Sequence, residues 1–313
     1  MIELTSLLST VGIFALMMTT GFIGGKTKVL GESVTEKLSV FVIKIVQPFL
    51  IVNSFLGLEF SVDNFKTGLL ILLIGICMHA GMAAIAFLLA KPIKPMDERK
   101  LSEYSMVFAN IGFIGFPILE AIFGKIGLFY GAFYLVSFHL FLWTWGIAIL
   151  ARNRKDIKIT PRKIFINNGT VPIAIGLVLF LINIKYPAFI TSFTSAIADI
   201  GTPVSIMITG ANLARRSFKK MFTNWHVYYV CAMRLIAMPL AAIVIVKLLG
   251  LPDYLVIFSG VMAAMPCPAV VTMFGEMYKI SPGYASELVG SSTLLSIATI
   301  IPVATFAQFV ASL

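Results

Sequence analysis

The chain has 313 residues, of which 59% are hydrophobic and only 12% carry a charge. Soluble domains hold about 25% charged residues, so the composition excludes an ordinary soluble domain and predicts an all-α integral membrane protein. The net charge of +10 would suit nucleic-acid binding in a soluble protein. Here the basic residues are spread over alternate loops, which indicates membrane topology and no nucleic-acid partner.

Apolar segments of membrane-spanning length recur along the whole chain. At about 20 residues for each crossing, there is room for about ten helices. The first residues lack a basic stretch and a small-residue cleavage site, so a retained helix is expected there rather than a signal peptide. The predicted helices cover residues 5–25, 36–57, 67–90, 102–123, 127–150, 162–182, 189–212, 224–248, 254–276 and 284–310.

Basic residues are concentrated in alternate connections between these segments. The positive-inside rule places such connections in the cytoplasm, so both termini are expected outside a cell membrane. The other connections hold only Lys66, Lys125, Lys185 and Lys247. The basic set is Lys26, Lys28, Lys37, Lys91, Lys94, Arg99, Lys100, Arg152, Arg154, Lys155, Lys158, Arg162, Lys163, Arg215, Arg216, Lys219, Lys220 and Lys279.

The longest polar stretch, residues 151–163, divides the chain into two halves, 1–155 and 156–313. Each half would hold five helices, and an odd number means that the second half enters the membrane from the opposite side. We therefore predict a five-plus-five inverted repeat. The features that align between the halves are Gln47-Pro48 with Thr202-Pro203, His79 with Arg234, Phe116-Pro117 with Cys267-Pro268, and Phe123-Gly124 with Phe274-Gly275.

Two helix-breaking runs, 110–117 and 265–269, lie in the fourth and ninth segments. A membrane helix is broken only where another helix, a water-filled cavity or a ligand satisfies the freed backbone groups. Matched breaks in two halves indicate a secondary transporter and its substrate site. The half-helices that start after the breaks would point their N-termini at the crossing, which suits an anion.

Polar and small residues at the breaks are the first candidates for substrate binding. Asn110 can contact the ligand or bond to a freed carbonyl. Gly112 and Gly115 allow close approach of a substrate or of another helix. The candidates are Asn110, Gly112, Gly115, Pro117, Pro266, Cys267, Pro268, Arg234 and Asn53, and Lys44 and Asn212 could also line the cavity.

Arg234 lies well inside the eighth segment, where a charge costs about 2.5–3.5 kcal/mol. It could bind a substrate carboxylate in bidentate fashion. Equally, it could cap carbonyls or pair with Asp199 or Glu120. His79, Asp199 and Glu120 are candidates for proton or ion coupling, and His139 and Glu287 are also considered. A membrane histidine is otherwise a hydrogen-bond partner between helices.

Motifs of membrane enzymes and ATP-driven pumps are missing from the sequence. It contains no Gly-x-Ser-x-Gly, no His-Glu-x-x-His and no Walker A loop. The three cysteines lie inside apolar segments and offer neither a disulfide framework nor a clustered metal site. We therefore expect neither an enzyme nor a cofactor.

Three motifs resemble the auxin efflux carrier family, which includes plant auxin exporters and bacterial malate- or malonate-type permeases. They are residues 110–117, 38–48 and 201–211. The resemblance implies scaffold helices 1, 2, 6 and 7, transport helices 3–5 and 8–10, and an elevator movement on a plan shared with the bile-acid symporters. It also implies that helices 4 and 9 are broken and cross, that Asn110 faces the substrate, and that the chain forms a homodimer. The absence of a long central hydrophilic loop makes the likeness one to a bacterial member. Residues 265–269 lack the Asn-Pro pair of some plant members, and His79 lies in the third helix, where some plant members keep an acidic residue.

The expected function is secondary active transport of a small organic anion, such as malate or malonate. Two alternatives stay open. One is a sodium-coupled organic-anion symporter of the bile-acid-carrier type. The other is a membrane sensor or lipid-binding scaffold that keeps the fold but does not transport.

Overall fold

The computed structural model describes residues 3–56, 60–154, 162, 166–184, 186–215 and 224–313. These residues form helices, and no strand occurs among them. The structure therefore confirms the all-α prediction. Several basic loop residues used for the topology lie outside the described residues: Lys155, Lys158, Lys163, Lys185, Arg216, Lys219 and Lys220.

The helices of the first half follow the apolar segments closely. They are α1 (Leu4–Lys26), α2 (Glu32–Phe41), α3 (Gln47–Leu56), α4 (Val62–Leu89), α5 (Met96–Val107), α6 (Phe116–Phe123), α7 (Lys125–Phe141) and α8 (Ile147–Ala151). Those of the second half are α10 (Thr170–Ile182), α11 (Ala188–Ala198), α12 (Gly201–Ala214), α14 (Trp225–Ala232), α15 (Met238–Leu248), α16 (Asp253–Ala263), α17 (Val270–Met277) and α18 (Pro282–Ser312).

Eight helical stretches in the described part of the chain have the length and hydropathy of a membrane span. At the sixth and ninth predicted positions stand shorter apolar helices, α10 and α16. The protein is therefore a multi-pass membrane protein, and the count of ten crossings stays a prediction.

Several predicted boundaries differ from the structure: the second and third helices begin at Glu32 and Val62, four and five residues earlier than expected. The fourth helix begins at Met96 and not near residue 102, because Asp97 and Glu98 occupy its first turn, where negative charge stabilises a helix N-terminus. In the sixth segment, α10 begins at Thr170. There the Asn167 side-chain oxygen accepts the N–H groups of Gly169 and Thr170, at 2.9 and 3.0 Å, and such a turn starts a helix.

In the part of the chain that the structure describes, four π-turns interrupt the α-helices: η1 (Val42–Val46), η2 (Ile111–Gly115), η3 (Leu142–Gly146) and η4 (Met233–Ala237). In three of them, η1, η2 and η4, a proline stands two residues after the end of the turn. These prolines are Pro48, Pro117 and Pro239. Proline has no N–H, so one carbonyl in the preceding turn loses its α-helical donor. The residue before each proline instead donates its N–H five residues back, which is the π pattern.

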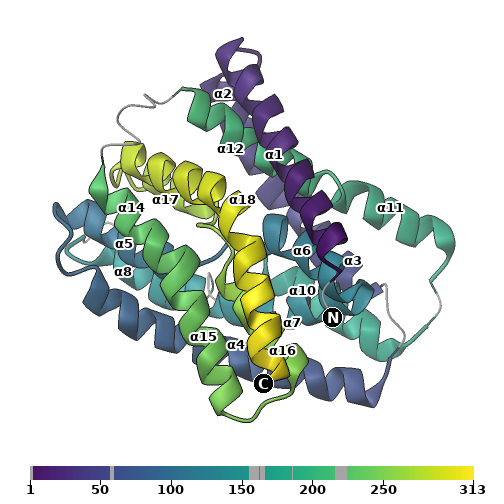
Figure 1. The fold of residues 1–313 in the computed structure, drawn as a ribbon. Coiled ribbons are helices and arrows are strands. Elements are labelled where there is room, and N and C mark those ends of the chain that lie inside the picture. Colours follow the sequence, from purple (N-terminus) through teal and green to yellow (C-terminus); the bar gives the residue numbers. More distant parts are fainter. Residues whose placement is uncertain (1–2, 57–59, 155–161, 163–165, 185, 216–223) are drawn as a thin grey trace.

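The helices pack in two sets. In one, α1 lies along α12, and α3 packs against α10 and α11. In the other, α4 packs on α7, and α16 packs on α15 and α18. Figure 1 shows α1 crossing over α12 at the upper edge of the molecule and α18 running beside α15 at its centre. A Cβ on Gly21 or Gly210 would overlap the backbone of Met207 or Met18, so small residues set the close contact of α1 with α12.

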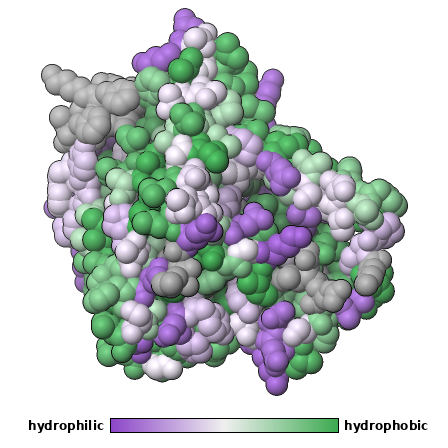
Figure 2. All heavy atoms as spheres, turned by 45° about the vertical axis from the view of Figure 1, so that its right-hand side comes forward, coloured by the Kyte–Doolittle hydropathy of each residue, from purple (hydrophilic) through white to green (hydrophobic). Residues whose placement is uncertain are grey.

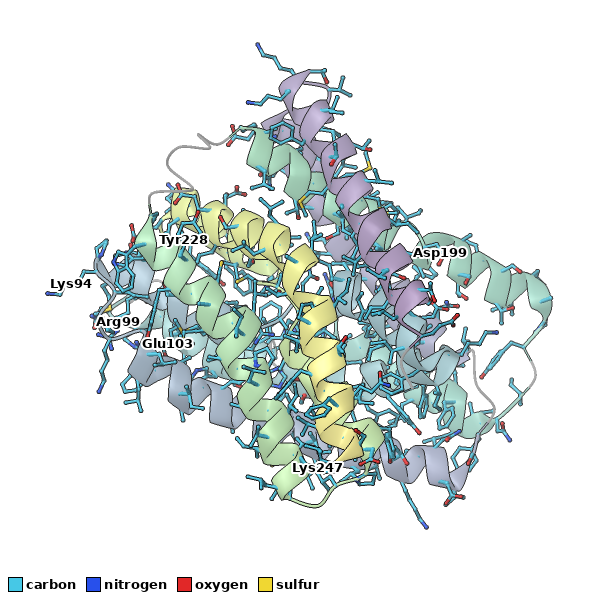
Figure 3. All side chains as sticks on the ribbon, in the orientation of Figure 1. Lys94, Arg99, Glu103, Asp199, Tyr228 and Lys247 are labelled. Carbon is cyan, nitrogen blue, oxygen red and sulfur yellow. The ribbon has the colours of Figure 1, made fainter. Side chains whose placement is uncertain are left out.

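The two ends of the molecule differ in the connections that they carry. The N- and C-termini lie towards one end, whereas the α1–α2 and α4–α5 connections lie towards the other (Figure 1). Lys94 and Arg99 lie at that other end, away from Asp199 and Lys247 (Figure 3). This arrangement agrees with the alternation of basic connections along the sequence.

Large apolar side chains on the outside of the helices face away from the protein. Leu16 is 69% exposed and Leu73 is 57% exposed. Figure 2 shows hydrophobic residues over much of one face, with hydrophilic residues gathered in separate groups. Such surfaces suit contact with lipid, whose tails are as apolar as leucine.

Candidate functional site

The first break separates α5 from α6. The backbone is extended at Phe108, with φ −96° and ψ 141°, and it re-enters a helical path only after Asn110. Gly112 and Gly115 disfavour a continuous helix, and Pro117 removes an N–H from its start. The break predicted at 110–117 is thus confirmed, and it begins two residues earlier.

The second break separates α16 from α17. Residues 264–269 leave the helical path, and Pro266 and Pro268 cannot donate helical hydrogen bonds. The expected break at 265–269 is therefore confirmed. The Pro268 carbonyl accepts the N–H of Val271 at 3.0 Å, so the new helix starts directly after this proline.

The two breaks touch each other through their backbones. The N–H of Asn110 donates to the carbonyl of Pro266 at 2.8 Å. Cys267 adds two contacts: its N–H donates to Ser292 Oγ at 3.1 Å, and its Sγ lies 3.7 Å from the carbonyl oxygen of Ser105. The breaks therefore satisfy part of each other's freed backbone, as a membrane interior requires.

Arg234 joins the last turn of α5, before the first break, to the start of the second break. Its Nε donates to the Met265 carbonyl at 3.0 Å and its Nη1 to the Met106 carbonyl at 3.2 Å. Nη1 also lies 3.7 Å from Met82 Sδ. The residue is 0% exposed. Of the roles considered for Arg234, the structure shows the capping of carbonyls, and the acidic partners Asp199 and Glu120 lie elsewhere.

Asn110 and Gly112 lie where the helix restarts. Asn110 is 5% exposed, and its side chain has no hydrogen-bond partner in the part of the chain that the structure describes. A Cβ on Gly112 would meet only Leu50, at 3.9 Å, so the space beside this glycine is open. At Gly115 a Cβ would lie 3.3 Å from Met262, which makes Gly115 a packing position.

A cavity of about 270 Å³ opens between α3, α6, α7 and the α11–α12 region. Four predicted site residues line it: Asn53, Pro117, Glu120 and Asp199. Leu50, which neighbours Gly112, lines it as well. The cavity therefore lies beside the first break and between the two packed sets of helices.

Sequence reasoning missed the hydroxyl groups of this cavity. Asn53 accepts a hydrogen bond from Thr194 at 3.1 Å and donates one to Ser195 at 3.3 Å. Ser195 and Thr202 line the cavity with Asp199. Ser195, Asp199 and Thr202 are spaced four and three residues apart, which places them on one helical face. This polar face was the sequence signal that could have predicted the hydroxyl groups of the cavity.

The two membrane histidines have separate surroundings. His79 is buried, with Nδ1 2.7 Å from the Gly75 carbonyl and its ring stacked on Phe141. His139 Nε2 lies 3.3 Å from Gln47 Nε2, and a Cβ on Gly169 would overlap the His139 ring. His79 Nδ1 also lies 3.4 Å from Ser137 Oγ of α7, so each histidine has a polar contact with another helix, and neither lines the cavity.

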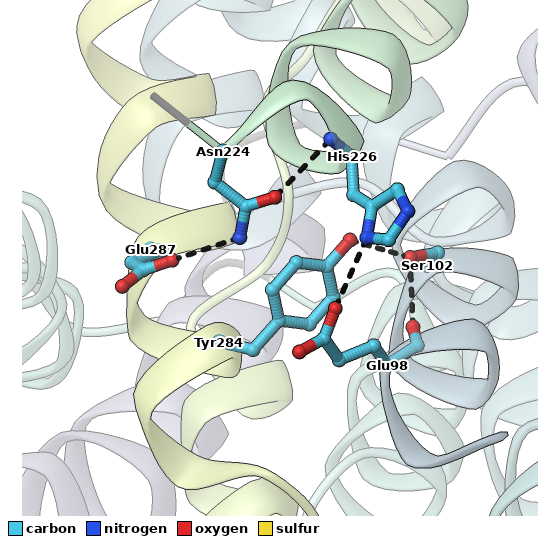
Figure 4. Close-up of polar contacts among 6 residues, drawn as sticks. All are labelled: Glu98, Ser102, Asn224, His226, Tyr284 and Glu287. Carbon is cyan, nitrogen blue, oxygen red and sulfur yellow. Dashed lines mark hydrogen bonds and ion pairs between the residues drawn. The ribbon is translucent and has the colours of Figure 1, made fainter. Parts of the chain in front are cut away.

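Six residues form a further polar cluster, drawn in Figure 4, and none of them lines the cavity. His226 Nδ1 is 3.1 Å from Glu98 Oε2, and Ser102 Oγ is 2.7 Å from the Tyr284 hydroxyl. Asn224 Nδ2 donates to Glu287 at 3.3 Å. This cluster joins α5, α14 and α18, and it places Glu287 away from the cavity.

The remaining candidates do not line the cavity. Lys44 is exposed within η1, and Asn212 Oδ1 accepts a hydrogen bond from Arg215. Within the described ranges, no group of three or more histidine, cysteine or acidic residues could hold a metal ion.

Comparison with known proteins identifies the family. The model of a family described as "Membrane transport protein" matches residues 6–303, nearly the whole chain. No curated protein matches the chain at a significant level. The resemblance in the three sequence motifs is thereby confirmed. The chain belongs to the membrane transport protein family, that of the auxin efflux carriers, and is a multi-pass membrane transporter.

Proposed function

We propose that the protein is a secondary active transporter of a small organic anion that carries a carboxylate. The observation that carries this proposal is the backbone contact between Asn110 and Pro266, which joins the two breaks. The C-terminal half-helices start within a few residues of that contact, and each helix N-terminus has a partial positive charge of about +0.5.

The charges at the crossing support an anion as cargo. The helices α5 and α16 end there with about −0.5 each, and the Arg234 guanidinium, bound to carbonyls of both ends, balances them. The N-termini that follow the breaks have no such balancing group among the contacts described. An anion supplies it, and Asn110 offers an amide beside it.

An elevator movement fits the place of the cavity. Helices α3, α11 and α12 belong to the scaffold implied by the family, whereas α6 and α7 belong to its transport part. The cavity lies between these sets. We propose that the transport part slides along the scaffold with the crossing inside it, in a homodimer in the cell membrane whose termini are outside.

The test is uptake of labelled mono- and dicarboxylates by proteoliposomes, with proton and sodium gradients imposed separately. Saturable uptake driven by a gradient supports the proposal and names the coupling ion. The absence of saturable uptake for every acid under both gradients refutes it.

A sodium-coupled symporter of the bile-acid-carrier type is the second candidate. The two carboxyl groups in the cavity, Glu120 and Asp199, favour it, because carboxylates are suitable ligands for a hard cation. Uptake that requires a sodium gradient and ignores a proton gradient would support this candidate.

A further inference from the structure

The cavity beside the first break has only acidic ionisable groups in its wall. Of its lining residues, Glu120 and Asp199 are ionisable, and none is basic. Glu120 comes from α6, and Asp199 lies between α11 and α12, so two separate parts of the fold each place a carboxylate in the wall. A cargo in this cavity therefore meets two carboxylates.

The rest of the lining is neutral. Asn53, Ser195 and Thr202 supply amide and hydroxyl groups, and Leu50, Phe116 and Leu128 supply apolar surface. Such a wall accepts hydrogen-bonding and apolar parts of a cargo without any counter-charge.

The guanidinium of Arg234, which binds the last turn of α5 and the second break, does not reach this cavity. Arg234 is fully buried, and its donors point to Met106, Met265 and Met82. Positive potential is thus confined to the helix N-termini at the breaks, which together amount to about one unit charge. One carboxylate can be neutralised there, and a second carboxylate on the same cargo would face Glu120 and Asp199.

Resting on the proposed function, we infer that the cargo is a monoanion: one carboxylate group on an otherwise uncharged small molecule. Glu120 and Asp199 are the specificity-determining residues that reject a second carboxylate by like-charge repulsion. Discrimination then comes from a repulsive element built against the wrong substrate.

The test compares succinamate with succinate in proteoliposomes. The two acids have the same chain length and differ in one end, an amide in place of a carboxylate. Initial uptake rates are measured in sodium-free buffer at pH 7.5, with the membrane potential held at zero by valinomycin and equal potassium on both sides. These conditions keep sodium from neutralising the second carboxylate and keep voltage from favouring either charge.

The wild-type protein is expected to show a KM for succinamate that is about tenfold lower than for succinate. Glu120→Gln and Asp199→Asn should each lower the KM for succinate severalfold and that for succinamate much less, and the double variant should nearly abolish the difference. Both positions are exposed, so the amides fit without repacking. Asp63→Asn is the matched control, because Asp63 is exposed and does not line the cavity.

Three results would overturn the inference. Equal KM values of the wild type for the two acids would overturn it and leave the proposed function intact. A change of both KM values by the same factor in the amide variants would show that the carboxylates do not select charge. No saturable uptake of these or any other carboxylates would refute the proposed function, and the inference with it.

Discussion

Replacing Arg234 by methionine tests the capping of the two breaks. The change keeps a long side chain but leaves the carbonyls of Met106 and Met265 without their donor. A buried carbonyl without a partner costs about 1–3 kcal/mol, so the two together cost about 2–6 kcal/mol. Part of this is offset, because the burial of a charge is itself unfavourable.

The measurement is the apparent Tm of the purified protein in detergent. At about 2 °C for each kcal/mol in a large domain, Arg234→Met should lower the Tm by about 4–12 °C. The Tm of Arg234→Lys should lie between those of the wild type and Arg234→Met. An ammonium group keeps the charge but lacks the planar fork that reaches both carbonyls. Lys44→Met is the control: it removes an exposed charge from a membrane helix, and the Tm should change little.

Two results would contradict this reasoning. A Tm of Arg234→Met equal to that of the wild type would show that the carbonyl contacts contribute nothing to stability. A stable Arg234→Met protein that no longer binds any carboxylate would instead place the guanidinium against the substrate.

Two further substitutions test packing and charge elsewhere. Gly169→Ala should destabilise the protein by about 1–3 kcal/mol through overlap with His139, whereas Gly81→Ala, where a Cβ meets nothing within 4 Å, should be neutral or stabilising in the same thermal assay. Glu103→Gln should lower the Tm by several degrees, because the Glu103 side chain is 0% exposed and accepts two hydrogen bonds from Arg152, at 2.8 and 3.0 Å. A Glu103→Gln protein as stable as the wild type would mean that this ion pair contributes no net stability.

The breaks were predictable from the sequence because their causes are local. Gly112, Gly115 and the prolines at 117, 266 and 268 act on their own turns, so the residue types suffice to place each break within two residues. The same holds for the apolar spans, where hydropathy and length decide the outcome.

The partners of Arg234 were beyond the sequence. The carbonyls that it binds lie 31 and 128 residues away along the chain, and any freed carbonyl would have served equally well. Its cost in a membrane showed only that a partner must exist. The start of the fourth helix was misjudged for another reason: its first turn is charged, and composition alone assigns such a turn to a loop.

The cavity combines a part that the sequence predicts, the polar residues, with a part that it does not, their arrangement in space. Asn53, Glu120 and Asp199 were identified as polar residues in apolar helices, but nothing in the sequence placed them around one space. That depends on how α3, α6 and the α11–α12 region pack. That His79 and Glu287 lie outside this space likewise depends on how the helices pack, which the sequence did not show.

The π-turn η3 differs from the other three because no proline follows it. A π-turn accommodates one residue more than the α-turn it replaces. The side chains of α8 therefore point in the directions that they would have if α7 and α8 were one regular α-helix with one residue fewer between them. Loss of a single residue from Leu142–Gly146 would therefore leave the buried faces on both sides in place. The same deletion in the middle of α7 would rotate every following side chain by about 100°. Length variation within this helix is tolerated best at that one turn.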